Sequence, residues 1–434
     1  MQVQLSSLPR CVSGSAPRPD QRIGARPHSV GGSICTVNVT RRLTTRPTEE
    51  RASVSPLELF FDLVFVFALT RVTELWGHDP SSVNLLHGVL VMAVLWWSWV
   101  GYSWVANLVR ADEGVLRVVM LAAMSAVFVI ALTIPEAFDD LPGGLDAPLV
   151  FAVGYFVVRM LHILIFLVIS KEDPQLRGQV MRFVPSMLTG TTFLLIASQL
   201  TGPWQTVMWF LALAGDYLGT LIGGTGWRLR SVSHFAERHS SFVIIALGES
   251  IASIGIGVAS LPTTWAIIVA SLLGLAVSSL LWWAYFDVTS LMVEQGFEAS
   301  RGRHRIRIAQ RCYSYAHLPM VLGIVMVSLG LKKILYYVGD GNEHRLTDPL
   351  QGWPLVALFG GAALYLAALV YFKQYGAGAF SVPRTVTVVV LLALIPLAWH
   401  LPALVTLGLL TAVLLVLIAY ETFVFAERRR TIRA

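Results

Sequence analysis

Ionisable residues stand inside the apolar stretches of this chain, where they are costly and are therefore the first candidates for chemistry. Two carboxylates, Glu58 and Asp62, are four residues apart and share one face of a helix. A charged carboxylate facing lipid near the membrane centre costs about 2.5–3.5 kcal/mol, so it needs a partner, a proton or a cation. The pair predicts a gate or an ion site. For Glu58, a capping box with Ser55 is the structural alternative, whereas Asp62, about 6 Å deeper, lies too deep for capping.

A second group of ionisable residues opens another apolar stretch. His234, Glu237 and Arg238 come first, and Glu249 follows about 16 Å further along a helix. We predict a cytoplasmic gate that consists of Glu58, His234, Glu237 and Arg238. Glu249 then falls near the middle of the membrane, where a carboxylate is a candidate functional group. Its structural alternative is an ion pair with Arg159, the basic residue that the predicted spans place at mid-depth.

Further polar residues fall at depth in other predicted spans. His317 precedes Pro319, whose missing N–H would kink a helix and free a carbonyl. Histidine titrates near neutral pH, so such a set could relay protons. For each residue taken singly, a satisfied hydrogen bond between helices is the favoured interpretation. The candidate intramembrane ion site comprises Asp62, Arg159, Asp216, Glu249, Asp287 and His317.

The elements that must position these residues are apolar helices. Hydrophobic residues make up 55% of the 434 residues and charged residues 13%, with a mean hydropathy of +0.67. A soluble protein needs more charge on its surface, and runs of about 20 apolar residues cross a hydrocarbon core as helices. We predict an all-α polytopic membrane protein with twelve spans. They are expected at about 56–75, 83–107, 115–137, 147–170, 180–201, 203–223, 234–259, 264–293, 308–330, 352–373, 382–400 and 402–425.

Lys and Arg are distributed unevenly over the predicted connections. Both tails and every second connection carry 27 of them, whereas the other connections carry four. By the positive-inside rule, the basic side is cytoplasmic and includes both termini. We therefore predict a cell membrane protein, in the inner or plasma membrane. This distribution also explains the net charge of +6, so no nucleic-acid partner is needed.

The first 51 residues differ from the rest of the chain. They hold eight Arg and three acidic residues and have no apolar run of the secretory kind. We predict a disordered basic tail over 1–51, with an organelle transit peptide as the compositional alternative. Residues 52–425 then form the transmembrane domain, and 426–434 a second basic cytoplasmic tail.

Two aromatic pairs indicate an internal repeat. Leu95-Trp96-Trp97 in the second predicted span recurs as Leu281-Trp282-Trp283 in the eighth, and 63–69 resembles 242–247 at a similar offset of about 180 residues. The pattern predicts a 6+6 duplication with halves of about 52–226 and 227–425. An even repeat keeps both halves parallel, as in large transporters. The alternative is coincidence in helices that both need tryptophans as interface anchors, although such rings could also stack on a ligand.

Three motifs carry a resemblance to a known family. Glu58–Leu69 reads ELFFDLVFVFAL, and Glu237–Ile251 reads ERHSSFVIIALGESI. The third motif combines Tyr313, His317-Leu318-Pro319 and Gly323. Together they resemble the low temperature requirement A (LtrA) family of bacterial membrane proteins, over roughly residues 50–425. The resemblance implies a multi-pass architecture and a link to growth at low temperature, but no settled molecular activity.

Signatures of enzymes and of metal sites are missing from the sequence. It contains no His-Glu-x-x-His, Walker A or dinucleotide-binding motif. The three cysteines, Cys11, Cys35 and Cys312, lack metal-ligand spacing. We therefore predict no enzymatic activity, catalytic residue, cofactor or metal.

The leading functional hypothesis is a secondary transporter for an unknown small solute, with proton coupling as an option. Its predicted partners are the lipid bilayer and that solute or ion, and its oligomeric state is left open. A proton or cation channel is the first alternative, because Phe61 to Ala68 is weakly similar to the first helix of a lysosomal-type potassium and proton channel family. An intramembrane lipid-acting enzyme or sensor is the second, because it would fit the cold-growth phenotype.

Overall fold

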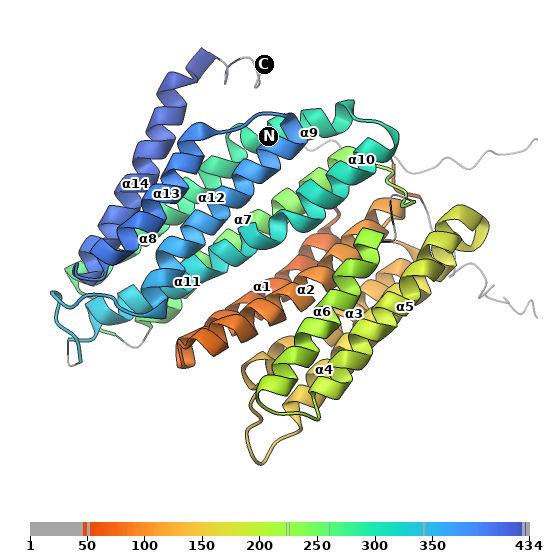
Figure 1. Ribbon diagram of the computed structural model, residues 1–434, viewed down its shortest axis with the longest axis horizontal. Helices are drawn as coiled ribbons and strands as arrows, with labels where there is room; N and C mark the ends of the chain where they lie inside the picture. Colours follow the sequence, from red (N-terminus) through yellow and green to blue (C-terminus); the bar gives the residue numbers. More distant parts are fainter. Residues whose placement is uncertain are drawn as a thin grey trace, which may run out of the picture. The chain divides into compact units, whose positions relative to one another are not determined.

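The computed structural model describes residues 47–49, 53–222, 224, 226–259, 261–341, 343–427 and 430. In these residues the chain is helical and forms no β-strand (Figure 1). The predicted tail therefore lies almost wholly outside the described residues, as does much of 426–434. The long helices are α1 (Pro56–His78), α2 (Ser82–Leu108), α3 (Gly114–Thr133), α4 (Ala147–Ile169), α5 (Pro174–Ala197), α6 (Pro203–Ile222), α7 (Val232–Val258), α8 (Trp265–Phe286), α11 (His317–Gly339), α12 (Trp353–Ala377), α13 (Val382–Ala398) and α14 (Ala403–Val424). Short helices α9 (Thr289–Ala299) and α10 (Gly302–Ile308) and a π-helical segment (Ala309–Tyr315) connect α8 to α11.

A long helix lies in each predicted apolar run, and this confirms the all-α membrane fold. Nine helical stretches of the described chain are long and apolar enough to cross a membrane. Helix α13 is shorter, with 17 residues. Helix α1 carries Glu58, Asp62, Arg71 and Glu74 along its length, and these charges lower its hydropathy. The count of twelve spans therefore stays a prediction.

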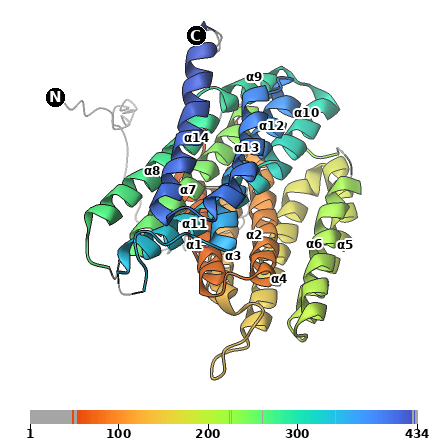
Figure 2. The same ribbon diagram turned by 60° about the vertical axis from the view of Figure 1, so that its left-hand side comes forward.

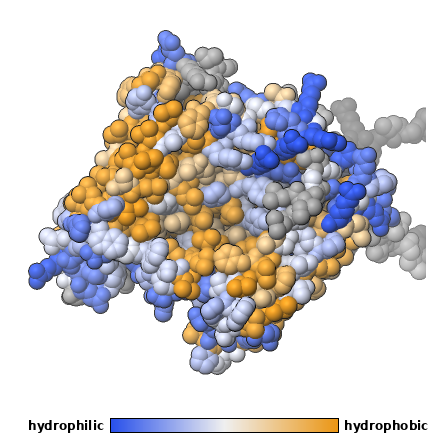
Figure 3. All heavy atoms as spheres, in the orientation of Figure 1, coloured by the Kyte–Doolittle hydropathy of each residue, from blue (hydrophilic) through white to orange (hydrophobic). Residues whose placement is uncertain are grey.

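Successive long helices run in alternating directions, so their connections gather at two ends. At one end, Thr48 donates to the Ala106 carbonyl (3.0 Å), and Asn107 donates to the Ser231 carbonyl (2.6 Å). Arg228, in the connection from α6 to α7, reaches Asp173 before α5 (3.1 Å). The basic connections of the sequence lie at this end. Figure 3 shows hydrophilic surface at the right of the view and hydrophobic surface over α13 and α14.

Two predicted spans differ from the observed helices. The run expected over 264–293 is interrupted, because α8 ends at Phe286 and Asp287 caps it. The Thr289 hydroxyl donates to the Ala284 carbonyl (2.9 Å) and accepts from Arg384 (2.9 Å), so side chains satisfy the backbone at this break. The prediction that placed Asp287 inside a span is therefore corrected: it lies half-buried at a helix end.

The helix that contains Pro319 widens before the proline. The segment from Ala309 to Tyr315 is π-helical, and the Ala316 N–H bonds to the Arg311 carbonyl (3.1 Å), five residues back. The Ser314 carbonyl is thereby available to Trp96, whose indole N–H donates to it (2.7 Å). Extra-wide turns of this kind are frequent at functional sites.

The tryptophans of α2 are core residues and not interface anchors. Trp96, Trp97, Trp99 and Trp104 are all buried. Two of them donate to Ser314 of the π-helical segment, because Trp104 reaches its hydroxyl (3.1 Å) while Trp96 bonds its carbonyl. The belt interpretation is therefore wrong for α2. Trp282 and Trp283 of α8 are exposed on the outer surface, where it still applies.

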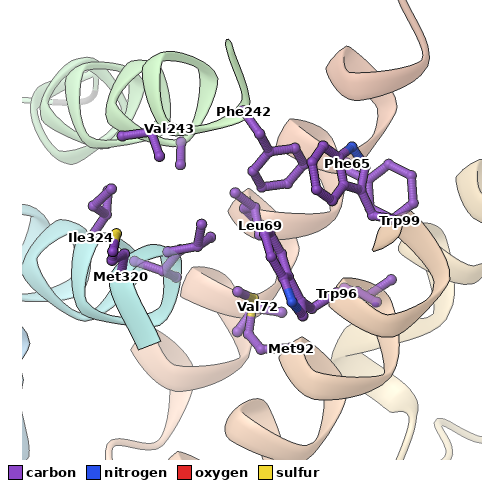
Figure 4. Close-up of a cluster of buried hydrophobic side chains, with 14 of the residues drawn as sticks. Phe65, Leu69, Val72, Met92, Trp96, Trp99, Phe242, Val243, Met320 and Ile324 are labelled. Atoms are coloured by element: carbon purple, nitrogen blue, oxygen red, sulfur yellow. The ribbon is translucent and has the colours of Figure 1, made fainter. Parts of the chain in front are cut away.

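Helices α1–α6 and α7–α14 pack as two groups (Figures 1 and 2) that meet along α1, α2, α7 and α11. Figure 4 shows the apolar side chains between them. Phe65, Leu69 and Val72 of α1 lie among Trp96 and Trp99 of α2, Phe242 and Val243 of α7, and Met320 and Ile324 of α11.

The two groups share a pattern of neighbours. Helix α1 packs on α2 and α3, as α7 packs on α8 and α11. The series α3, α4, α5, α6 makes successive contacts, as does α11, α12, α13, α14. In both groups the second helix also contacts the last, α2 with α6 and α8 with α14.

Two glycines, Gly323 and Gly361, face each other where α11 packs on α12, and this generates a prediction. A Cβ atom on Gly323 would lie 2.5 Å from the Gly361 carbonyl oxygen. Gly323→Ala is therefore expected to lower the free energy of unfolding by about 1–3 kcal/mol, as overpacking does. Thermal unfolding in lipid nanodiscs measures this. Gly408→Ala in α14 is the control, because its Cβ would meet open space; equal losses in both variants would contradict the prediction.

Candidate functional site

A buried ion pair links α1 to α7. Arg238 Nη2 lies 2.8 Å from Asp62 Oδ1, and Nη1 donates to Oδ2 (3.0 Å). Both side chains are fully buried. Trp99 of α2 adds a third helix, because its indole N–H donates to Asp62 Oδ1 (2.7 Å). The deep carboxylate thus has both a cation and a neutral donor, which is what a buried charge requires.

Glu58 extends this ion pair toward the end of the helices. Its Oε1 lies 3.1 Å from His234 Nε2 and 3.6 Å from Arg238 Nε. Its Oε2 accepts from the Ser55 N–H (2.8 Å), which completes the capping box. The capping alternative and the predicted gate therefore involve the same side chain. We call Glu58, Asp62, His234 and Arg238 the α1–α7 charge cluster.

Glu237 stands apart from the α1–α7 charge cluster. It is exposed, and its Oε2 accepts from the Val54 N–H (3.2 Å). The structure therefore brings together three of the four predicted gate residues. It adds Asp62, which the sequence had grouped with the mid-depth ions. Asp62 and the gate residues form one cluster because Arg238 follows His234 by one turn on the same face of α7. Arg238 therefore reaches Asp62, which lies one turn beyond Glu58 on α1.

A pocket reaches the outer edge of the α1–α7 charge cluster. Its empty volume is about 780 Å³, and Glu58 and His234 form part of its wall. The other lining residues come from the segment before α1 and from the end of α2 and the connection after it: Thr48, Glu49, Ser53, Val54, Ser55, Pro56, Ala106, Arg110, Ala111 and Asp112. Most of these residues are polar or small, so water has a route to Glu58.

Arg159 forms an ion pair with Asp216 and not with Glu249, the alternative partner that the sequence suggested. Its Nη2 lies 2.7 Å from Asp216 Oδ1, and Tyr155 donates its hydroxyl to Asp216 Oδ2. Both charged side chains are 2% exposed. Gly190 of α5 allows this pair, because a Cβ there would lie 2.9 Å from Asp216 Cγ. The pair joins α4 to α6 within the first helix group, and Glu249 is not part of it.

Glu249 lies fully buried where α7 meets α1 and α11. Thr73 of α1 donates to its Oε1 (2.9 Å), and so does Ser253 one turn further along α7 (2.7 Å). Beside it, the Ser250 and Ser328 hydroxyls bond each other (2.8 Å). Within the described residues Glu249 forms no ion pair. It is a buried carboxylate surrounded by hydroxyl groups.

The two remaining candidates belong to separate surroundings. His317 Nε2 lies 2.9 Å from the Tyr285 hydroxyl, and its Nδ1 lies 2.9 Å from the Cys312 carbonyl. Its ring packs edge-on against that of His239, with centroids 5.2 Å apart. Asp287 lies at the far end of α8, where it lines a pocket with Arg384.

The candidate ions thus form several clusters and not one central cavity. The sequence identified the charged members but missed their uncharged partners, Trp99, Tyr155, Thr73 and Tyr285. The double-Trp motif pointed to the region of Trp99. No signal marked the hydroxyl residues, because Ser, Thr and Tyr are frequent in membrane helices and take part only where the packing brings them to a charge.

The Asp62–Arg238 pair generates a prediction on stability. Arg238→Gln leaves Asp62 buried without its cation, and loss of one partner of such a pair costs about 3–5 kcal/mol. The double variant Asp62→Asn/Arg238→Gln removes both charges, so it is expected to be more stable than Arg238→Gln alone. Unfolding in nanodiscs measures both.

The control for that pair is Arg71→Gln, which breaks the partly exposed pair of Arg71 with Glu74 on α1. It should change stability by less than about 1 kcal/mol. If the loss of stability in the double variant equals the sum of the losses in Asp62→Asn and Arg238→Gln, the two residues do not depend on each other.

Comparison with known proteins confirms the family resemblance over most of the chain. The model of the family described as bacterial low temperature requirement A protein (LtrA) matches residues 53–419. A protein of Rhizobium meliloti (strain 1021), itself described as uncharacterized, is 29% identical over 365 residues, which are 80% of this chain and 83% of that protein. No solved structure matches. The matched region includes the two motifs that meet at Asp62 and Arg238. The chain belongs to the LtrA family of bacterial membrane proteins.

Proposed function

We propose that this protein is a secondary transporter that moves a small solute with the help of a proton gradient. The observation that carries the proposal is the α1–α7 charge cluster. A buried ion pair is weak evidence for stability, because desolvation offsets its attraction. A pair that separates and re-forms is instead suited to a two-state element between packed helices.

The position of the α1–α7 charge cluster supports the role of a gate. It joins the first helix of one group to the first helix of the other. A polar pocket approaches it from the end where the basic connections lie. In the proposal, that end faces the cytoplasm of a cell membrane, with both termini on that side, and separation of Asp62 from Arg238 opens it.

The matching neighbours of the two helix groups support a 6+6 parallel repeat. In that arrangement α1 corresponds to α7, α2 to α8, and α3–α6 to α11–α14. Rocking of one repeat against the other is the usual mechanism of transporters built in this way. The side chains have diverged, because Trp96 and Trp97 are buried while Trp282 and Trp283 are exposed. The proposed repeat is therefore one of backbone arrangement.

We assign the coupling proton to Glu249. It lies on the same interface as the α1–α7 charge cluster, about 16 Å further along α7 by helical rise. Hydroxyl groups surround it, and the described residues offer it no ion pair. Lys332 of α11 acts on it electrostatically without forming an ion pair, and a buried carboxylate that has no ion-pair partner is most easily accommodated with a proton. Thr73 and Ser253 donate to Oε1, whereas Oε2 has no hydrogen-bond partner among the described residues, which leaves it the atom that can carry a proton.

Reconstitution in liposomes tests the proposed transport. With an imposed pH gradient, the protein is expected to accumulate one class of solute with saturable kinetics, and a protonophore should abolish the accumulation. Pools of monocarboxylates, amino acids, sugars and amines serve as the first probes. A current that is linear in voltage without any added solute would contradict the proposal and indicate a proton or cation channel.

Two variants test the assigned residues. Glu249→Gln keeps the size and hydrogen bonds of the side chain but cannot exchange a proton. It is expected to lower proton-driven uptake at least about tenfold, the effect of about 1.4 kcal/mol, while solute exchange without a gradient persists. Asp62→Asn weakens the gate and should lower both modes.

The matched control for both variants is Glu343→Gln in the exposed segment after α11. It should leave both transport modes unchanged. Normal flux in Glu249→Gln and Asp62→Asn at equal protein abundance would show that the site assignment is wrong. Loss of folded protein alone would indicate a structural role.

A further inference from the structure

A cavity lies between the first helix group and the π-helical segment, away from the α1–α7 charge cluster. Its empty volume, which includes space open to the surroundings, is about 410 Å³. Most of its wall is aromatic or aliphatic, with Arg159, His162 and Gln310 as the main polar residues. The remaining lining residues are Trp97, Val100, Gly101, Trp104, Phe166, Phe183, Trp227 and Ser314.

Two polar side chains in this wall have unused hydrogen-bonding capacity. Arg159 and His162 are 2% and 3% exposed. Arg159 Nε forms no hydrogen bond with the described residues. The His162 ring has the Gly101 backbone as a weak partner for one nitrogen, and its other nitrogen has none among the described residues. Buried polar groups are normally paired, so these atoms mark a place where a bound molecule or water would complete the structure.

The charged residue in the wall of the cavity is Arg159. Arg159 lines the cavity, whereas its counter-ion Asp216 does not and contacts Arg159 through Nη2. Asp216 is held in turn by the Tyr155 hydroxyl. The guanidinium therefore remains in place without a ligand, and it still offers Nε–H toward an acceptor. A cation would be repelled here, whereas a carboxylate oxygen would gain a charge-assisted hydrogen bond.

The shape of the wall limits the rest of the ligand. Trp97, Trp104 and Trp227 supply flat apolar faces, and Phe166 packs edge-on against Trp227 with ring centroids 5.6 Å apart. Gly101 makes room for His162, because a Cβ at that position would lie 2.6 Å from the imidazole ring. Flat apolar walls around a few polar groups suit a planar organic molecule with one polar end.

We propose that this cavity binds a small monocarboxylate with a flat apolar body. Its carboxylate would accept from Arg159 Nε–H and from His162, and its body would lie between the tryptophans. The identification of this ligand as the transported solute rests on the proposed function, but its binding does not. The two are therefore measured separately.

A series of three ligands tests the proposal: benzoate, benzamide and benzylamine. They share a ring and differ in the charge of the polar end. Binding to the full-length protein in nanodiscs is measured by equilibrium dialysis and by the shift of the thermal unfolding temperature. Benzoate is expected to bind at least about tenfold more tightly than benzamide, and benzylamine should give no shift. Equal or tighter binding of benzylamine, or no binding of benzoate at millimolar concentration, would overturn the proposal.

Two variants locate the binding in this cavity. His162→Phe keeps the size of the ring but removes both nitrogens, and Arg159→Lys keeps the charge beside Asp216 but removes Nε–H. Each is expected to weaken benzoate binding at least about tenfold. The control is His87→Phe, a buried histidine of α2 that stacks on Phe138 and lies outside the cavity; it should leave benzoate binding unchanged.

The stability of the ligand-free variants separates binding from a structural role. If His162→Phe lowers the unfolding temperature but keeps the full benzoate shift, the cavity is not the site and the proposal is overturned. Benzoate binding that is sensitive to His162 but is not accompanied by benzoate uptake in liposomes would support the site and contradict only its role in transport.

Discussion

Asp62 and Arg238 hold two charges that are fully buried between helices, and much of the structure follows from the need of each charge for a partner. Each needs the other within contact distance, so α1 and α7 must cross where these residues face each other. Trp99 supplies the remaining donor, which draws α2 to the same place. The apolar residues of Figure 4 then fill the space around this crossing. The contact between the two helix groups is thus set by an ion pair and sealed by apolar packing.

The same requirement explains why the polar residues form separate clusters. A charge that lies among apolar helices takes the nearest partner that lets it stay buried. Arg159 finds Asp216 two helices away within its own group, and Glu249 is met by hydroxyls of α1 and α7. Each cluster is small because every added polar group needs its own partner. The cavity beside Arg159 and His162 is the place where this pairing is left incomplete.

Much of the fold could be predicted, because lipid reduces the choice of structures to helices of known length. Each expected apolar run contains a helix, and the basic connections gather at one end. The predicted spans differ from the helices at places where side chains take over hydrogen bonds of the backbone. Thr289 and Asp287 end α8 early, and the π-helical segment before Pro319 takes the place of a simple kink. The hydropathy of a sequence does not depend on such local hydrogen bonds, so the predicted span 264–293 joined α8 to the start of α9.

The sequence by itself determined the family, the helical membrane fold and the identity of the charged residues, because apolar length and buried charge are properties of composition and spacing. Only the tertiary structure decided which charges meet. It paired Arg159 with Asp216, placed Asp62 with Glu58 and Arg238, and buried the tryptophans of α2. The physical reason is that spacing fixes the face of a helix on which a residue lies, whereas its partner depends on which helix packs against that face.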